Sequence, residues 1–260
     1  MSFAIRIERT GGPEVMQREE VPVSSPAASQ ARVRHAAVGL NYIDIYHRTG
    51  LYPLPLPSGL GLEAAGVVEA VGAGVENLQP GDRVAYAGGP VGAYCEQRCL
   101  AADRLLKLPE AISFETGAAM MLQGLTVAYL LRRTYRVQPG ETVLIHAIAG
   151  GVGLIACQWA KALGATVIGT TSSAEKAALA REHGCDAVID YGREDVARRV
   201  RELTGGEGVS VVYDGVGKDT FTASLDSLRT CGMLVSFGNA SGAVPPFDPL
   251  LLTQKGSLFL

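Results

Sequence analysis

The stretch His146-Ala-Ile-Ala-Gly-Gly-Val-Gly153 decides the fold of this chain. It follows an apolar run at residues 142–146, which predicts a strand, and it opens residues 151–163, where apolar side chains recur at helical spacing. Small residues in such a turn let the backbone approach a phosphate, and the first N–H groups of the helix point at it. The spacing Ala147-x-x-Gly150-x-x-Gly153 is a variant of the dinucleotide-binding motif. It predicts that Gly150, Gly151, Val152 and Gly153 bind a pyrophosphate, although glycine-rich turns also occur without ligands.

The sequence around this motif alternates short β-branched runs with helical patterns. Such alternation is typical of βαβ units and predicts a parallel, doubly wound α/β sheet. Up to about residue 115 the sequence pattern differs. Short apolar runs are broken there by Gly and Pro, which predicts strands and turns. The expected strands are residues 31–39, 64–71, 83–87, 142–146, 166–170, 187–190, 209–213, 233–237 and 256–260; the expected helices are residues 120–133, 151–163, 174–183, 194–203 and 218–228.

The end of the second predicted strand of this sheet bears on the choice of dinucleotide. NAD-binding proteins carry an acidic residue there, about 20 residues past the loop, for the ribose 2′-hydroxyl. Here the residues are Thr170-Thr171-Ser172-Ser173, with Lys176 following. Hydroxyl groups and an ammonium would hold a 2′-phosphate that a carboxylate would repel. NADPH is therefore the predicted cofactor, with Ser172, Ser173 and Lys176 at its 2′-phosphate; the alternative for Lys176 is a solvated helix lysine.

Composition limits the remaining classes of function. The 260 residues have a net charge of -3, which gives no basic surplus for nucleic acid. The sequence contains no run of about 18 apolar residues, so no membrane span is predicted. The charged start of the chain, Arg6 to Arg9, does not resemble a secretory signal. Five cysteines, an odd number at irregular spacing, favour free thiols in a reducing compartment. A cytoplasmic protein is expected.

Further motifs complete a resemblance to a known family. These motifs are Gly11-Gly-Pro-Glu-Val15, Asn41-Tyr-Ile-Asp44 with Tyr46, Gly50-Leu-Tyr-Pro53, Gly59-Leu-Gly-Leu-Glu-Ala-Ala-Gly66, Pro80-Gly-Asp-Arg-Val84, Gly124-Leu-Thr126, the glycine-rich loop, Val212-Tyr-Asp214 and Ser236-Phe-Gly-Asn239. With these motifs the chain resembles the zinc-free quinone reductases (zeta-crystallin-like) of the medium-chain dehydrogenase/reductase superfamily over nearly its whole length.

The resemblance implies a GroES-like catalytic domain of irregular β structure at residues 1–124 and a Rossmann NADPH-binding domain at residues 125–260, with the active site in the cleft between them. It implies further cofactor contacts from Thr126, Tyr191, Phe237, Gly238 and Asn239. It also implies that Asn41, Asp44, Tyr46 and Tyr52 line the catalytic site. The residues alone leave other interpretations open: Asn41 and Asp44 as turn or capping residues, and the two tyrosines as half-buried aromatics.

The motifs also bear on metal chemistry. Zinc-dependent alcohol dehydrogenases share the implied fold, but Leu62 stands where they have a histidine and Asn41 where they have the first cysteine ligand. No metal is therefore expected. Without one, reduction of a quinone fits better than oxidation of a simple alcohol, since a quinone needs hydride delivery and weak hydrogen-bond donors. The alternatives are an NADPH-dependent alkenal or enone double-bond reductase, and a crystallin-like protein that binds NADPH with little catalysis.

The resemblance makes two further predictions about the end of the chain. Family members continue past residues 256–260 with a segment that returns to the catalytic domain, and this sequence lacks it. They also form homodimers through the last strand of the Rossmann sheet, so a homodimer through residues 256–260 is expected.

Overall fold

The computed structural model describes all 260 residues, which form two compact units, Met1–Leu122 and Gln123–Leu260. The boundary lies within helix α2 (Phe114–Tyr129). The functional division of the chain at residues 124 and 125 stays a prediction. No helix is long and apolar enough to span a membrane.

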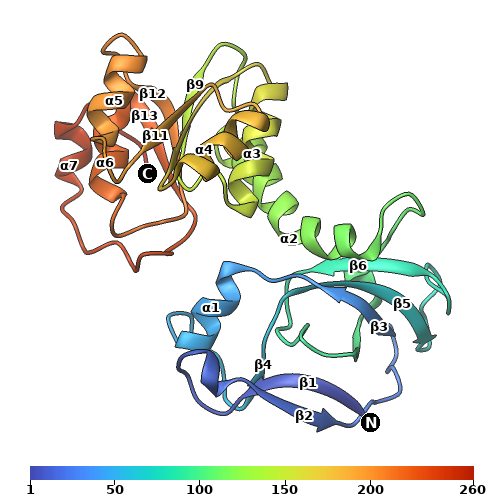
Figure 1. The fold of residues 1–260 in the computed structure, drawn as a ribbon. Coiled ribbons are helices and arrows are strands. Elements are labelled where there is room, and N and C mark those ends of the chain that lie inside the picture. Colours follow the sequence, from blue (N-terminus) through green and yellow to red (C-terminus); the bar gives the residue numbers. More distant parts are fainter. The chain divides into compact units, whose positions relative to one another are not determined.

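The first unit is built from antiparallel strands, as its short apolar runs predict (Figure 1). One sheet has the order β2-β1-β4 and the other β7-β3-β5-β6-β8. The only α-helix wholly within the unit is α1 (Tyr42–Thr49), and short 3-10 turns lie at Pro13–Val15 and Ala102–Arg104. The strands are β1 (Ser2–Ile7), β2 (Gln17–Val21), β3 (Gln30–Val38), β4 (Ser58–Gly59), β5 (Glu63–Val71), β6 (Arg83–Ala87), β7 (Gln97–Ala101) and β8 (Leu106–Lys107).

The second unit is a parallel sheet with strand order β11-β10-β9-β12-β13. The strand order reverses direction at β9, where β10 and β12 flank it, and ligands of such sheets bind outside the carboxyl ends at this point. The strands are β9 (Thr142–Ile145), β10 (Thr166–Thr171), β11 (Ala187–Asp190), β12 (Val209–Asp214) and β13 (Leu228–Ser236). The helices are α3 (Gly151–Ala162), α4 (Ala174–Glu182), α5 (Val196–Leu203), α6 (Phe221–Ser227) and α7 (Leu250–Gln254).

Alternate residues of the central strands pack on opposite faces of this sheet. Val143 and Ile145 belong to a core with Ala156 and Ala160 of α3, whereas Leu144 belongs to a second core with residues of α5 and α6. Figure 1 shows α3 and α4 on one side of the sheet and α5 and α6 on the other. The predicted α/β class, with a GroES-like unit and a doubly wound Rossmann sheet, is confirmed.

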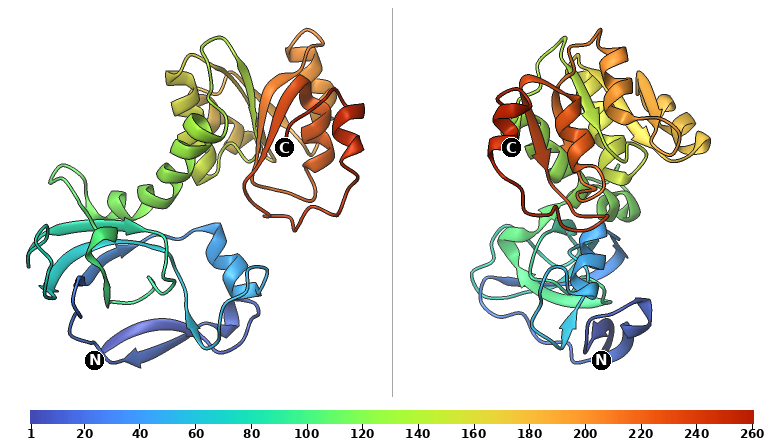
Figure 2. Two further views of the ribbon diagram at one scale, coloured as in Figure 1. Left: turned by 180° about the vertical axis from the view of Figure 1, so that it is seen from behind. Right: turned by 90° about the vertical axis from the view of Figure 1, so that its left-hand side faces the viewer.

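Several predicted elements have other bounds. The strand expected at residues 256–260 is wrong: Gly256 and Ser257 have φ values of 118° and 54°, so the chain turns there. The segment meets the edge strand β13 through one parallel bridge, Phe259 to Met233, and through the Cys231 N–H, which donates to the Gly256 carbonyl. The two views of Figure 2 show this last segment returning to the sheet. Helix 120–133 instead begins at Phe114 and ends at Tyr129, followed by a π-helical turn, Leu130–Thr134.

Side-chain hydrogen bonds explain two further differences. The helix expected from residue 218 begins at Phe221, because the Asp214 carboxylate accepts from the N–H groups of Val216 and Gly217 and holds that segment as a loop. Helix α1 is not among the elements that the sequence predicts; it begins at Tyr42, and the backbone N–H of its N-cap Asn41 donates to the Asp44 carboxylate at 2.9 Å. This local bond is one half of a capping box.

Candidate functional site

The glycine-rich loop forms a tight turn between β9 and α3. Ala147 has φ 51°, and its carbonyl oxygen accepts from the Gly150 N–H at 2.8 Å. A Cβ atom on Gly153 would lie 2.5 Å from the carbonyl oxygens of Ala147 and Ile148, so only glycine allows this approach. Helix α3 begins at Gly151 without a side-chain cap, whereas Ser173 caps α4 and Asp195 caps α5. The first N–H groups of α3 therefore remain for a ligand.

The carboxyl end of β10 opens onto a hollow of about 540 Å³. Ser172 and Ser173 line it, together with Arg181 of α4 and Arg193 of the loop after β11. Lys176 and Tyr191 are exposed near the hollow but do not line it. Sequence reasoning missed both arginines; the spacing of Ser173, Ala177 and Arg181 on one face of α4 is the signal that could have identified Arg181.

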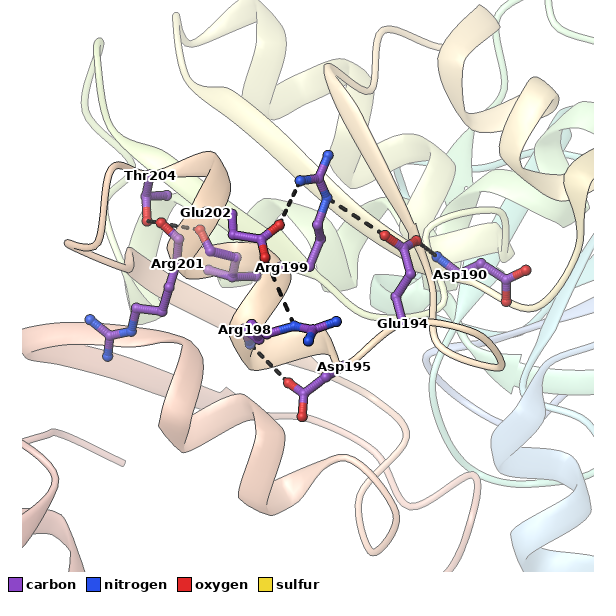
Figure 3. Close-up of polar contacts among 9 residues, drawn as sticks. Asp190, Glu194, Asp195, Arg198, Arg199, Arg201, Glu202 and Thr204 are labelled. Carbon is purple, nitrogen blue, oxygen red and sulfur yellow. Dashed lines mark hydrogen bonds and ion pairs between the residues drawn. The ribbon is translucent and has the colours of Figure 1, made fainter.

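Two carboxylates, Asp190 and Glu194, also line this hollow, and both form ion pairs and accept backbone hydrogen bonds. Arg193 lies 3.6 Å from Asp190, which also accepts from the Gly192 N–H. Figure 3 shows Arg199 between Glu194 and Glu202, at 3.6 Å and 2.8 Å, while Glu194 also accepts from the Asp190 N–H. No ion pair involves Arg181, which leaves its guanidinium as the available positive charge of the hollow.

The segment Phe237-Gly-Asn239, after β13, packs on the loop after β12. The Phe237 N–H donates to the Asp214 carbonyl, and a Cβ atom on Gly238 would lie 2.7 Å from the Gly215 carbonyl oxygen. On α2, Thr126 is partly buried. The nearby Gln123, which sequence reasoning missed, contacts the start of α3, because a Cβ atom on Gly151 would meet its amide oxygen at 2.2 Å.

In the first unit, Asn41 and Asp44 belong to a buried polar cluster with Glu63 and Tyr94. The Asn41 amide donates to Glu63 at 2.7 Å, and the Tyr94 hydroxyl donates to Asp44 at 2.7 Å. Glu63 is fully buried and also accepts from the Leu122 N–H at 2.7 Å. Burial raises the pKa of both the Asp44 and the Glu63 carboxyl. The Asp44 carboxylate accepts a hydrogen bond from the Asn41 N–H at the start of α1, so its contacts are those of a capping residue.

Tyr46 and Tyr52 form an aromatic group on and beside α1. Their ring centroids lie 4.9 Å apart, and Tyr42 packs edge-on against Tyr46 at 5.4 Å. His47, whose pKa is lowered by burial, stacks at the edge of Tyr52 at 6.2 Å. The structure thus brings Tyr46 and Tyr52 together, whereas Asn41 lies at the start of the same short helix.

No three His, Cys, Asp or Glu side chains gather where they could share a metal ion. The two cysteines closest in sequence contact other groups: Cys99 contacts the Ser24 carbonyl at 3.4 Å, and Cys95 lies beside His35. Burial raises the pKa of both thiols, which disfavours the thiolate that zinc requires. That this protein works without a metal stays a prediction.

Comparisons with known proteins agree with this architecture. Residues 27–110 match the alcohol dehydrogenase GroES-like domain and residues 151–259 the zinc-binding dehydrogenase family. A quinone oxidoreductase of Pseudomonas aeruginosa is 57% identical, over 100% of this chain and 80% of its own length. A 2-haloacrylate reductase of a Burkholderia species is 47% identical, over 100% of this chain and 80% of its own length. The crystal structure of Escherichia coli quinone oxidoreductase complexed with NADPH matches with a TM-score of 0.97 and 53% identity, over 99% of this chain and 79% of that one. This chain belongs to the quinone oxidoreductase family of the medium-chain dehydrogenase/reductase superfamily.

Proposed function

We propose that this chain is an NADPH-dependent, zinc-independent reductase of quinones. The observation that carries the proposal is the uncapped start of α3, behind a turn into which Gly153 fits only because it lacks a side chain. Relatives named quinone oxidoreductase, one of them complexed with NADPH, support it. The residues present fit this cofactor: uncapped N–H groups suit its pyrophosphate, and a hollow with serines and a free arginine suits its 2′-phosphate.

In this mechanism each unit supplies one set of groups. NADPH, when bound, supplies a hydride. The N–H groups of residues 151–153, at the start of α3, would hold the pyrophosphate. Ser172, Ser173 and Arg181, which line the hollow, would hold the 2′-phosphate, with the exposed Lys176 and Tyr191 reaching it from beside the hollow. Thr126 and the segment at residues 237–239 complete the proposed cofactor site.

The first unit would bind the quinone and stabilise its developing negative charge. The Asn41 amide and the hydroxyl groups of Tyr46 and Tyr52 are the donors that could do so. Asp44 acts differently in this proposal, as a positioning residue: it accepts from the Asn41 N–H and so fixes the start of α1. Its place in the catalytic site stays a prediction.

A second candidate is reduction of an activated carbon–carbon double bond. The 2-haloacrylate reductase at 47% identity favours it, since an acrylate carries such a bond. Both reactions need hydride delivery and stabilisation of an oxyanion, so the same donors would serve. Steady-state assays of NADPH consumption with quinones, enones and haloacrylates separate the two, and no turnover of any quinone by the NADPH-bound protein would exclude the first.

Preference for NADPH over NADH tests the cofactor site. Lys176→Ala and Arg181→Ala are each expected to weaken NADPH binding about tenfold or more, because each removes a charge-assisted contact to the phosphate. NADH affinity should stay unchanged, as measured by fluorescence titration. Arg198→Ala is the matched control: its side chain, on α5, is 75% exposed, pairs with Glu202 and lies outside the hollow. Equal weakening of both cofactors would contradict the assignment.

We also propose a cytoplasmic homodimer whose interface includes the segment at residues 256–260, which lies on the β13 edge of the sheet. Five free cysteines suit a reducing compartment. At the sheet edge, Phe259 and Leu260 remain 55% and 58% exposed, and an isologous partner would cover them. Phe259→Glu is therefore expected to shift sedimentation toward the monomer, while Leu250→Glu, at an equally exposed position on α7, should not. Identical sedimentation of both variants and the parent chain would place the interface elsewhere.

A further inference from the structure

A chain of buried polar side chains crosses the second unit at the carboxyl ends of its central strands. His146, directly after β9, lies 3.0 Å from Thr170 of β10 through Nδ1 and 3.0 Å from Ser224 of α6 through Nε2. Ser224 donates to the Asp214 carboxylate at 2.7 Å. All four residues are at most 3% exposed. None of them belongs to the proposed cofactor or substrate contacts.

Donor and acceptor capacity fixes the direction of this chain of hydrogen bonds. Asp214 as a carboxylate only accepts, and it also receives the Thr220 hydroxyl and the N–H groups of Val216 and Gly217. The single Ser224 proton therefore points to Asp214, and the Ser224 oxygen accepts from His146 Nε2–H. His146 Nδ1 then accepts from the Thr170 hydroxyl. Burial lowers the pKa of His146, in keeping with a neutral ring of the Nε2–H tautomer.

Both ends of the network are tied to segments that we assign to the cofactor. On one side, His146 begins the glycine-rich loop, and the Ile148 N–H donates to the Thr170 carbonyl. On the other side, Asp214 holds residues 216–220 by hydrogen bonds, and its carbonyl accepts from the Phe237 N–H. Movement of the His146 ring would therefore disturb the pyrophosphate loop and the segment at residues 237–239 together.

We propose that His146 is a positioning residue for the dinucleotide: its neutral Nε2–H tautomer, held between Thr170 and Ser224, sets the glycine-rich loop against the loop that follows Asp214. The inference rests on the proposed function, since it concerns the site that would bind NADPH. Thr170 and Ser224 act through His146 in this proposal, whereas Asp214 also holds the loop that follows it by its own hydrogen bonds. Buried networks of this kind lose more than one contact when a member is removed, because the remaining groups are left unpaired.

Two serines of α6 provide a matched test. Ser224 and Ser227 are both fully buried, but the Ser227 hydroxyl donates to the Ala223 carbonyl of its own helix. Ser224→Ala is expected to weaken NADPH binding about tenfold or more, with the KM for quinone unchanged, because it leaves His146 Nε2–H without an acceptor. Ser227→Ala removes an equally buried hydroxyl and should lower thermal stability alone. Equal effects of the two variants on NADPH affinity would overturn the proposal.

A second variant and a spectroscopic measurement test the proposal even if Ser224→Ala does not fold. Thr170→Val keeps the shape of the side chain and removes the donor to Nδ1, so it too should weaken NADPH binding. In ¹⁵N NMR of the parent chain, His146 should give the Nε2–H tautomer and no titration between about pH 5 and 8. An Nδ1–H tautomer, or a ring that titrates in this range, would overturn the proposal. Failure of the parent chain to bind NADPH would instead refute the proposed function, whereas binding that both variants leave intact refutes only the role of His146.

Discussion

Replacement of Gly153 by alanine is expected to remove most of the NADPH affinity of this chain and to lower its stability. The added Cβ atom would lie 2.5 Å from two backbone carbonyl oxygens, and backbone atoms cannot move aside as a side chain can. Overpacking of this kind costs about 1–3 kcal/mol of unfolding free energy. The turn that must shift is also the one that directs the first N–H groups of α3, so titration with NADPH should show the larger loss.

Gly124→Ala is the control for this effect. Gly124 also lies in a helix, α2, but a Cβ atom there meets nothing within 4 Å. Its replacement should leave stability unchanged or raise it by up to about 1 kcal/mol, as alanine favours a helix. Calorimetry that finds Gly153→Ala as stable as Gly124→Ala would mean that the turn can open without cost, and unaltered NADPH binding would remove the loop from the cofactor site.

Local patterns made the Rossmann unit predictable from its sequence. Most strands of the sheet are short β-branched runs, and helices such as α3 and α5 have apolar residues at helical spacing, so the pattern within about 15 residues predicts these elements. The capping box that starts α1 is also local, because Asn41 and Asp44 are three residues apart. The sequence leaves capping as one of several interpretations of these two residues and does not predict the helix that follows them.

Contacts between distant residues explain what the sequence could not predict. His146 and Ser224 are 78 positions apart, and no periodicity brings them together before the sheet is formed. Arg193 enters the hollow of Ser172 only because β11 pairs with β10. The strand predicted at residues 256–260 does not form. Its apolar residues are typical of a strand, but the turn at Gly256 and Ser257 leaves one bridge to β13.

Glu63→Gln is expected to be the most disruptive single-atom change in the first unit. Both carboxylate oxygens of Glu63 accept hydrogen bonds, one from the Asn41 amide and one from the Leu122 N–H, each at 2.7 Å. The glutamine NH₂ group must replace one of these acceptors and would face a donor. In a fully buried position this leaves unsatisfied groups that cost about 1–3 kcal/mol. Chemical denaturation should measure the loss, and quinone turnover should fall because Asn41 loses its partner.

The pH dependence of stability separates this effect from a merely steric one. Since burial raises the pKa of Glu63, its contribution to stability is fully present below the unfolded pKa of about 4.3 and is lost as pH rises through the higher folded pKa. The difference in unfolding free energy between the parent chain and Glu63→Gln should therefore shrink as pH rises through this window. Burial also raises the pKa of the neighbouring Asp44, but this residue is present in both proteins. Glu69→Gln, on the same strand β5, removes only surface ion pairs to Arg32 and Arg34 and should cost less than about 1 kcal/mol. A loss no larger than that of Glu69→Gln would mean that Glu63 is not the buried acceptor that holds Asn41. A difference that stays constant with pH would mean that burial does not raise the pKa of Glu63.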